Sequence, residues 1–237
     1  LGLSLPTITQ NLNNLAELGL IDTSKKISNT GGRNATAYSY IEKARYAVGL
    51  YLNRHHINCV AVDLSGNVIS LIRVRENFDL NDDNYLRKIG ETVEEVKKDT
   101  GLSDDRFLGV GIAVQGLISD DGERVTYGLT LNFTGVTRAD IAKYIPYHNR
   151  LFHDSAAAGY AEVWDRNDLD DAFYLSLSNS VGGAVIVANK IFEGERRKSG
   201  EIGHMTIIPK AGDRCYCGQR GCFDTVCRAN VLAEYAD

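Results

Sequence analysis

The chain has 237 residues, 43% of them hydrophobic and 24% charged, which is the composition of a globular protein with one large or two modest domains. Its net charge is −5, and no apolar run approaches the ~20 residues that a membrane-spanning helix needs. With no basic-then-apolar leader at the N-terminus, the sequence excludes a membrane protein and leads us to expect a cytoplasmic location.

The charge is uneven along the chain. Residues 1–48 hold five lysines and arginines against three acidic residues, an excess of two positive charges, so the rest of the chain carries a net charge of −7. A small basic head on an acidic body suits contact between the head and phosphates.

A short amphipathic helix is predicted at the start of the head. Ser4 is an N-cap residue with Pro6 just after it, and Gly19 ends the helix. The apolar stripe consists of Ile8, Leu12, Leu15 and Leu18. The outward face carries hydroxyls and amides, which both donate and accept hydrogen bonds, as the reading of base edges in a DNA major groove requires. These side chains are Thr7, Thr9, Gln10, Asn11, Asn13 and Asn14.

Two strands are expected next, over residues 21–27 and 35–40, around a turn at residues 29–33. The helix alone favours an ordinary surface helix followed by a hairpin. The order of the elements instead resembles the recognition helix and wing of a winged helix-turn-helix, with Arg33 at the wing tip suited to a narrow minor groove. We expect the helices that precede such a recognition helix to lie outside this chain.

From Arg45 the pattern is that of an α/β protein. One expected helix has Leu86, Ile89, Val93 and Val96 on a single face, a second lies around residues 139–144, and an Ala-rich helix opens at Asp154. Strands are expected over residues 46–53, 57–63, 68–75, 107–114, 150–152, 173–178 and 184–189, with a turn at Gly182-Gly183 before the last one.

Three of the five cysteines, Cys215, Cys217 and Cys222, lie within eight positions, and His204 precedes the first by eleven residues. Thiolates on a Gly-rich knuckle with a remote imidazole are the ligand set of a closed, structural zinc site, which leaves no open position for catalysis. The alternative is a disulfide with one spare thiol, which an odd cysteine count and the lack of secretory features disfavour. Cys59 and Cys227 are interpreted as buried small hydrophobes.

Two linked motifs carry a resemblance to a known family. Gly200-Glu201-Ile202-Gly203-His204 and Cys215-x-Cys217-Gly218-x-x-Gly221-Cys222 resemble the signature of the ROK family of repressors, open reading frames and sugar kinases, over nearly the whole chain. The resemblance implies an actin-like (ribonuclease H-like) α/β domain in residues 43–237, incomplete at its C-terminus, preceded by a partial winged helix-turn-helix in residues 1–42. It also implies Zn²⁺ on His204, Cys215, Cys217 and Cys222.

The resemblance further implies a sugar site. Glu201 and His204 would face the sugar hydroxyls, His204 through the ring nitrogen that the metal leaves free. Asp154 matches the general base of the kinases, and fixed carboxylates of this kind hold vicinal hydroxyls. Taken alone, Asp154 is equally an N-cap and Glu201 a surface ion-pair partner. Three further positions stand where family members contact sugar, each with an altered residue: Thr130, His153 and Asp224.

The phosphate loops of the family kinases are changed here. Tyr51, Asn53, Arg54 and His55 replace the Asp, two glycines and Thr of the first loop, and the second loop, residues 178–184, keeps only two of its glycines. We therefore expect a non-enzymatic repressor that binds operator DNA and a sugar or sugar-phosphate effector as a homodimer or dimer of dimers, with Asp154 a vestigial base. The alternatives are an ATP-dependent sugar kinase and a sugar-binding module without DNA function.

Overall fold

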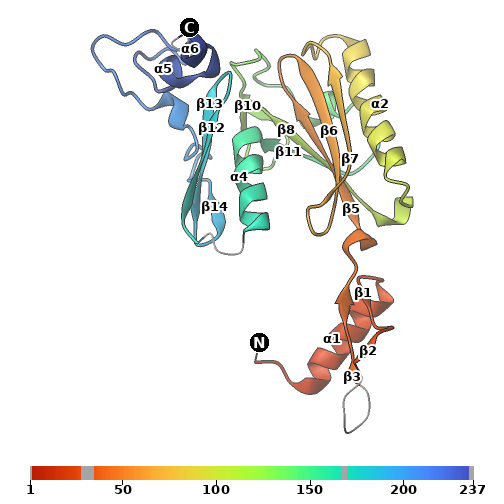
Figure 1. Cartoon of the computed structure of the whole chain (residues 1–237). Helices are drawn as coiled ribbons and strands as arrows, with labels where there is room; N and C mark the ends of the chain where they lie inside the picture. The colour runs from red at the N-terminus through yellow and green to blue at the C-terminus, as the bar shows by residue number, and fades with distance from the viewer. Residues whose placement is uncertain (1, 28–34, 167–169, 235–237) are drawn as a thin grey trace.

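The computed structural model describes all residues except 1, 28–34, 167–169 and 235–237. A small head protrudes from a body whose described residues form a five-stranded, a three-stranded and a two-stranded sheet (Figure 1). Within the described ranges, no helix has the length and apolar character to cross a bilayer.

The head consists of one helix and two short strand pairs. Helix α1 (Leu5–Glu17) begins as predicted, with Ser4 accepting the Thr7 N–H and Pro6 in its first turn. The two expected strands are each divided in two, because Asp22 accepts the Ser24 N–H at 2.8 Å and this local turn interrupts the ladder. The antiparallel pairs are β1 (Ile21–Asp22) with β4 (Ser39–Tyr40) and β2 (Lys26–Ile27) with β3 (Ala35–Thr36).

A short 3₁₀ turn, η1 (Glu42–Ala44), joins the head to the body. The Arg45 guanidinium donates to the Leu18 carbonyl at 3.2 Å, and the Ile41 N–H donates to the Leu20 carbonyl at 3.0 Å. These two bonds tie the C-terminal end of α1 to the segment that enters the body.

The first sheet of the body is five-stranded and mixed. Its order is β11-β8-β5-β6-β7, with β11, β8 and β5 parallel and β5, β6 and β7 an antiparallel meander. Buried residues alternate along β5 and β6, which is the periodicity from which the strands were expected. The strands are β5 (Tyr46–Leu52), β6 (His56–Asp63), β7 (Val68–Arg75), β8 (Phe107–Val114) and β11 (Asn149–His153).

Helix α2 (Asp83–Asp99) covers the outer face of this sheet (Figure 1). Its N-cap is Asp82, whose carboxylate accepts the Asn84 N–H at 2.9 Å. The predicted apolar face is confirmed, because Leu86, Ile89, Val93 and Val96 are all buried. Burial of each such side chain contributes about 1.5–3 kcal/mol, so this interface forms the main core. A 3₁₀ turn, η2 (Asp104–Arg106), leads from α2 into β8.

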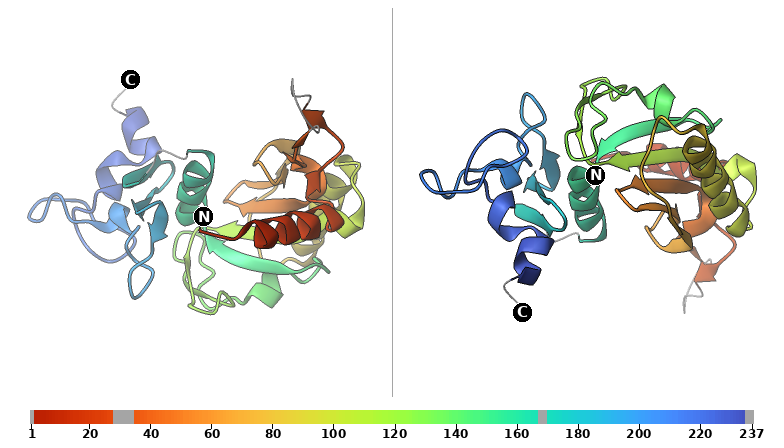
Figure 2. Two further views of the ribbon diagram at one scale, coloured as in Figure 1. Left: turned by 90° about the horizontal axis from the view of Figure 1, so that it is seen from below. Right: turned by 90° about the horizontal axis from the view of Figure 1, so that it is seen from above.

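The second sheet is an antiparallel meander of β12 (Ala172–Leu177), β13 (Val181–Val187) and β14 (Lys190–Phe192). Helix α4 (Asp154–Asp165) packs on all three strands and lies between the two sheets in each view (Figure 2). The turn expected at Gly182-Gly183 is wrong: both glycines lie within β13, and the chain turns at residues 178–180. A Cβ at Gly182 would collide with Ser155 of α4, so close packing explains the glycine.

The remaining elements are short. Helix α3 (Arg138–Ile141) is briefer than expected, starting from a capping box between Thr137 and Asp140. Cys59 is buried in β6 as predicted, whereas Cys227 is half-buried at the end of α5. The other bounds are β9 (Leu117–Ile118), β10 (Val125–Tyr127), η3 (Ile202–His204), α5 (Asp224–Cys227) and α6 (Ala229–Glu234).

Candidate functional site

The predicted metal ligands come together in one cluster. His204 ends η3, and the cysteines lie on the loop that follows, in which the Cys215 N–H donates to the Gln219 carbonyl at 2.8 Å. Gly221 has a positive φ of 69°, and a Cβ there would overlap the Ile208 carbonyl. The glycines of the motif therefore allow the knuckle that turns the sulfurs inward.

The distances within the cluster fit a tetrahedral zinc ion. The Nδ1 atom of His204 lies 3.5 Å from Cys215 Sγ, the Cys217 and Cys222 sulfurs are 3.7 Å apart, and all four ligand atoms lie within 4.8 Å of one another. Zn–S bonds of about 2.3 Å and Zn–N bonds of about 2.0 Å imply separations of about 3.8 Å between sulfurs and about 3.5 Å between sulfur and nitrogen.

The three cysteines of the cluster can ionise together only beside a cation. Burial raises the pKa of Cys215 to about 12, with the neighbouring Cys217 and Cys222 sulfurs adding to the effect. Three thiolates in such a place repel one another unless a positive ion compensates them. The residues present fit Zn²⁺, which would hold the loop in shape and supply no open coordination position.

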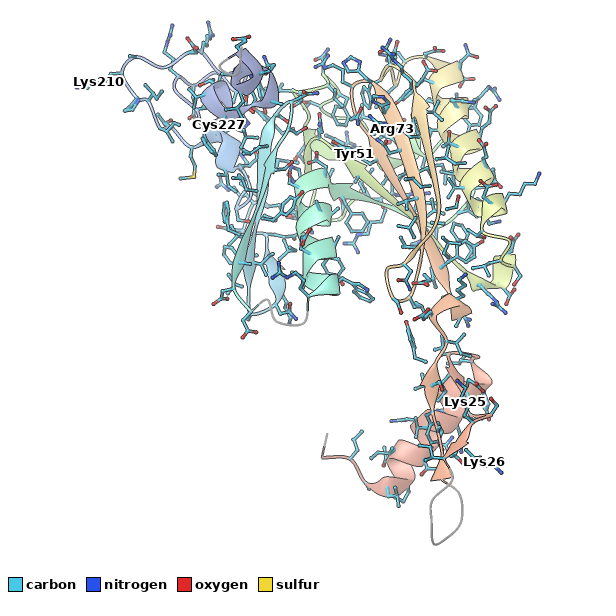
Figure 3. The ribbon with its side chains drawn as sticks, viewed as in Figure 1. Lys25, Lys26, Tyr51, Arg73, Lys210 and Cys227 are labelled. Carbon is cyan, nitrogen blue, oxygen red and sulfur yellow. The ribbon has the colours of Figure 1, made fainter. Side chains whose placement is uncertain are left out.

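A polar cavity of about 70 Å³ lies beside the cluster. Tyr51, Gln115 and His153 reach it from the carboxyl ends of β5, β8 and β11, the edge where ligands bind in open α/β sheets. Tyr51, near the end of β5, lies at the opposite end of the five-stranded sheet from the head with its Lys25 and Lys26 (Figure 3). The lining also includes Tyr127, Leu129, Thr130, Asp154, Ser155, Ser178, Ser180, Glu201, His204 and Tyr216.

Glu201 lies between two imidazoles in this cavity. One oxygen is 3.8 Å from His153 Nε2 and the other 3.8 Å from His204 Nε2, the ring nitrogen that does not face Cys215. Asp154 Oδ1 lies 3.6 Å from His153 Nε2. Burial raises the pKa of Asp154, while the charge of His153 opposes that shift. Four of the predicted sugar contacts, together with Thr130, thus converge on one space.

Asp224 is placed differently from the other predicted sugar residues. Its carboxylate is buried, accepts the Val181 N–H at 2.7 Å and lies 4.0 Å from Arg228, and it does not line the cavity. In this position Asp224 holds the first residue of β13, Val181, through a hydrogen bond. Its direct contact with a sugar stays a prediction.

A larger cavity of about 410 Å³ adjoins the polar one and shares Leu117, His153 and Glu201 with it. Its walls are mainly apolar, with Phe152, Ala156 and Ala157 among them. The smaller, polar cavity offers more fixed hydrogen-bonding groups and is therefore the candidate ligand site.

The turn between β5 and β6 uses most of its backbone N–H groups in hydrogen bonds within the turn, which leaves few for a phosphate. The Asn53 N–H donates to the His56 carbonyl at 3.1 Å, and the Asn53 side chain accepts the N–H groups of His55 and His56 at 3.0 and 2.9 Å. A phosphate cradle needs free amide donors. Three donors of this turn are already used within the turn.

The sequence did not indicate several residues of the cavity wall. Gln115 Nε2 donates to the Tyr51 hydroxyl at 3.2 Å, and burial together with the Asp154 carboxylate raises the pKa of Tyr51. Tyr216 packs edge-on against the His204 ring, with centroids 5.0 Å apart. The only feature of the sequence that could have indicated Tyr216 as a wall residue is its position between Cys215 and Cys217. Burial raises the pKa of Tyr216, against the effect of its hydrogen bond with Thr130.

The residues proposed for DNA contact are exposed where the structure describes them. Thr7, Thr9, Gln10 and Asn13 all point outward on α1. Gln10 Nε2 donates to Asn14 Oδ1 at 2.9 Å, and Thr9 donates to the Leu5 carbonyl. Arg33 lies outside the described residues.

Comparison with known proteins decides the family. The ROK family profile matches residues 47–237. The chain belongs to the ROK family. This ROK chain is 26% identical over 239 residues to the xylose repressor of Bacillus subtilis (strain 168), covering 98% of its own length and 61% of that protein. It is 24% identical over 250 residues to the transcriptional dual regulator NagC of Escherichia coli (strain K12), covering 96% and 56%.

Solved structures show the same fold. A ROK family transcriptional regulator, homologous to the MLC protein of E. coli, aligns with a TM-score of 0.76 at 21% identity, over 98% of this chain and 59% of that one. A ROK glucokinase from Streptomyces griseus, in complex with glucose and AMPPNP, aligns with a TM-score of 0.68 at 21% identity, over 81% and 60%. The ROK chain therefore has the mixed α/β, actin-like fold of both regulators and kinases, and spans about 60% of their length.

Proposed function

We propose that this ROK chain is part of a sugar-responsive transcriptional regulator, in the simplest case a repressor. The head would bind operator DNA as a winged helix-turn-helix, and the polar cavity would bind a carbohydrate effector beside a structural Zn²⁺. In this proposal the protein is not an enzyme.

One observation carries the proposal. The alignments with the xylose repressor and the solved regulator extend over 98% of the chain, head included, whereas the alignment with the glucokinase structure covers 81%. A head is therefore a feature shared with regulators. The turn between β5 and β6 supports the same conclusion, because the N–H groups of Asn53, His55 and His56 are bonded within the turn.

In the head, the proposed contacts with base edges come from Thr7, Thr9, Gln10 and Asn13, and Arg33 would enter the minor groove. All four helix residues are exposed, and hydroxyl and amide groups match the donor and acceptor pattern of bases. The excess of positive charge in residues 1–48 would favour the phosphate backbone.

In the cavity, Glu201 and Asp154 would accept hydrogen bonds from sugar hydroxyls, and His153, His204 and Thr130 would complete the polar wall. A sugar bound there would contact both sides of the cavity, since His153 ends β11 of the five-stranded sheet and Glu201 lies in the segment that follows β14 of the three-stranded sheet. Bound sugar would thus favour one relative arrangement of the five-stranded sheet and the three-stranded sheet. In a homodimer or dimer of dimers, this arrangement would change the spacing between two heads. The free energy by which sugar shifts this conformational equilibrium equals the difference between its binding free energies for the two arrangements.

A gel shift with the full-length protein and the promoter of its neighbouring sugar genes, at two salt concentrations, tests DNA binding. We expect salt-sensitive binding that weakens in a Gln10→Ala, Asn13→Ala double variant and persists in Asn81→Ala, which removes an exposed amide from the body. No salt-sensitive binding would indicate a sugar-binding module without DNA function. Unchanged affinity of Arg33→Ala would argue against a wing contact.

The second candidate function is an ATP-dependent sugar kinase, which the Asp154 carboxylate in the cavity favours. ADP release from ATP with a panel of hexoses, pentoses and hexosamines tests this function. We expect no turnover above the sugar-free rate. Robust turnover that Asp154→Asn abolishes would overturn the regulator proposal.

A further inference from the structure

The cavity wall contains the loop of residues 128–133. Its ends are anchored by a backbone hydrogen bond and by ring packing, whereas its tip has only one long backbone hydrogen bond within the loop. At its base, the Phe133 N–H donates to the Gly128 carbonyl at 2.9 Å, and the buried Phe133 ring packs on Phe78 with centroids 5.2 Å apart. At the tip, residues 129–132, the Asn132 N–H donates to Leu129 over a long 3.3 Å, and Asn132 has a positive φ of 56°. Leu129 and Thr130 of this tip line the polar cavity.

One strong bond reaches the tip from a distant part of the chain. The Arg54 guanidinium donates to the Thr130 carbonyl at 2.6 Å, 76 residues away in sequence. Charge-assisted bonds of this length are among the stronger hydrogen bonds in proteins. The Thr130 side of the tip, in turn, meets Tyr216 of the zinc loop, which packs on His204.

Backbone hydrogen bonds hold the main chain at Arg54, whose side chain is exposed. Its carbonyl accepts the Phe78 N–H at 3.1 Å, and the adjacent His55 carbonyl accepts the Glu76 N–H at 3.0 Å. Phe78 is also the residue that packs on Phe133 at the base of the loop. Both parts of the loop therefore contact the turn between β5 and β6. The base contacts it through Phe78, and the tip contacts it through the Arg54 side chain.

We infer that Arg54 is a positioning residue of the effector site: its bond to the Thr130 carbonyl holds the tip of the 129–132 loop against the cavity and so sets sugar affinity and selectivity. This inference rests on the proposed function. It assigns a purpose to a cationic side chain at a position where the resemblance to the kinases implies a glycine. Arg54 does not line the cavity and acts only through Thr130.

Two measurements on the full chain loaded with zinc test this role. The first is amide hydrogen exchange over residues 128–134. Arg54→Ala should speed exchange at the tip about tenfold, Arg54→Lys should restore most of the protection, and Arg75→Ala should leave it unchanged. Arg75 is the matched control, because it pairs with His56 beside the same turn and is exposed.

The second measurement is calorimetric titration with D-xylose, N-acetyl-D-glucosamine and D-glucose. For the sugar that binds the unaltered protein, Arg54→Ala should raise Kd about fivefold and change the ratio of affinities among the three. A merely structural role would lower the melting temperature and leave the affinities alone.

The outcomes separate the two claims. Unchanged exchange at residues 128–134 in Arg54→Ala, or faster exchange with unchanged sugar affinity, overturns the positioning role and leaves the proposed function standing. The titrations are extended to sugar phosphates and further sugars if none of the three binds; failure of every member of that panel to bind the unaltered protein contradicts the proposed function, and the effector role of Arg54 falls with it.

Discussion

The two ring nitrogens of His204 face different neighbours. Nδ1 faces the sulfur of Cys215, and Nε2 faces a carboxylate oxygen of Glu201 at 3.8 Å. At this separation the two groups are within ion-pair distance but too far apart for a hydrogen bond. A single residue thus connects the metal loop to the wall of the ligand cavity.

Loss of one ligand should empty the metal site. We expect about one zinc ion per purified chain, and near-complete loss in Cys217→Ser, because a hydroxyl replaces one of three thiolates in a closed site. Elemental analysis after dialysis measures the metal content. The matched control is Cys227→Ser, which changes a half-buried cysteine outside the cluster and should retain zinc. Full zinc content in both variants would contradict this ligand set.

At the scale of elements, α2 docks closely against the segment around Tyr144. Gly90 of α2 faces the Tyr144 backbone, and a Cβ there would lie 2.5 Å from the Tyr144 carbonyl oxygen. At the start of the same helix, Asp83 accepts hydrogen bonds from Lys143 at 2.6 Å and from the Tyr144 hydroxyl at 2.8 Å. Close backbone packing and one carboxylate therefore hold the helix at both places.

Gly90→Ala should destabilise the protein. Overpacking costs about 1–3 kcal/mol, and because a backbone carbonyl cannot rotate away we expect the upper end of that range. This outweighs the roughly 1 kcal/mol that alanine gains over glycine in a helix. Urea unfolding measures the difference. Glu95→Ala, an exposed change in the same helix, should leave the midpoint nearly unchanged, and equal midpoints for all three proteins would argue against this packing.

The Asp83 contacts predict a pH dependence. The Lys143 hydrogen bond, followed by that of Tyr144, lowers the pKa of Asp83. A carboxyl group whose pKa is lower in the folded state than in the unfolded state stabilises the fold. This stabilisation is fully present above the ordinary aspartate pKa and is lost as the pH falls through the pKa of the folded state. The difference in urea midpoint between the unaltered protein and Asp83→Asn should therefore shrink from about pH 6 to about pH 3. A constant difference would contradict the assignment.

At the scale of the whole molecule, the cavity lies where two units meet. The five-stranded sheet contributes Tyr51, Gln115 and His153, and the unit of β12, β13 and β14 contributes Val181 and Gly182, with Glu201 following. A ligand that bonds to both units stabilises the pair in one arrangement. Recognition and conformational response can thus reside in a single site.

Sugar binding should raise the thermal stability of the full chain. At a free concentration of 100 times Kd, a bound effector contributes about 2.7 kcal/mol, which corresponds to a rise in Tm of about 5–10 °C for a chain of this size. A thermal-shift screen measures this rise and names the effector. Glu201→Gln should abolish it and Glu195→Gln, an exposed change on the preceding loop, should preserve it. Equal stabilisation of both variants would remove Glu201 from the site.

The sequence alone predicted features whose information is local. The ligand spacing of the zinc loop, the apolar face of α2 and the alternation in β5 and β6 are each encoded within a few turns or residues, and all were recovered. The turn expected at Gly182-Gly183 failed because glycine marks close packing as well as turns, and only the contact with Ser155 distinguishes them.

The tertiary structure decided the composition of the cavity. Tyr51, Gln115 and His153 meet because β5, β8 and β11 pair in parallel and end at one edge. The Arg54–Thr130 bond spans 76 residues, and the burial of Asp224 beneath Val181 depends on how α5 packs on β13. Contacts between residues distant in sequence follow from strand order and packing. The sequence by itself therefore determined the candidate metal cluster, and the fold determined which side chains line the cavity.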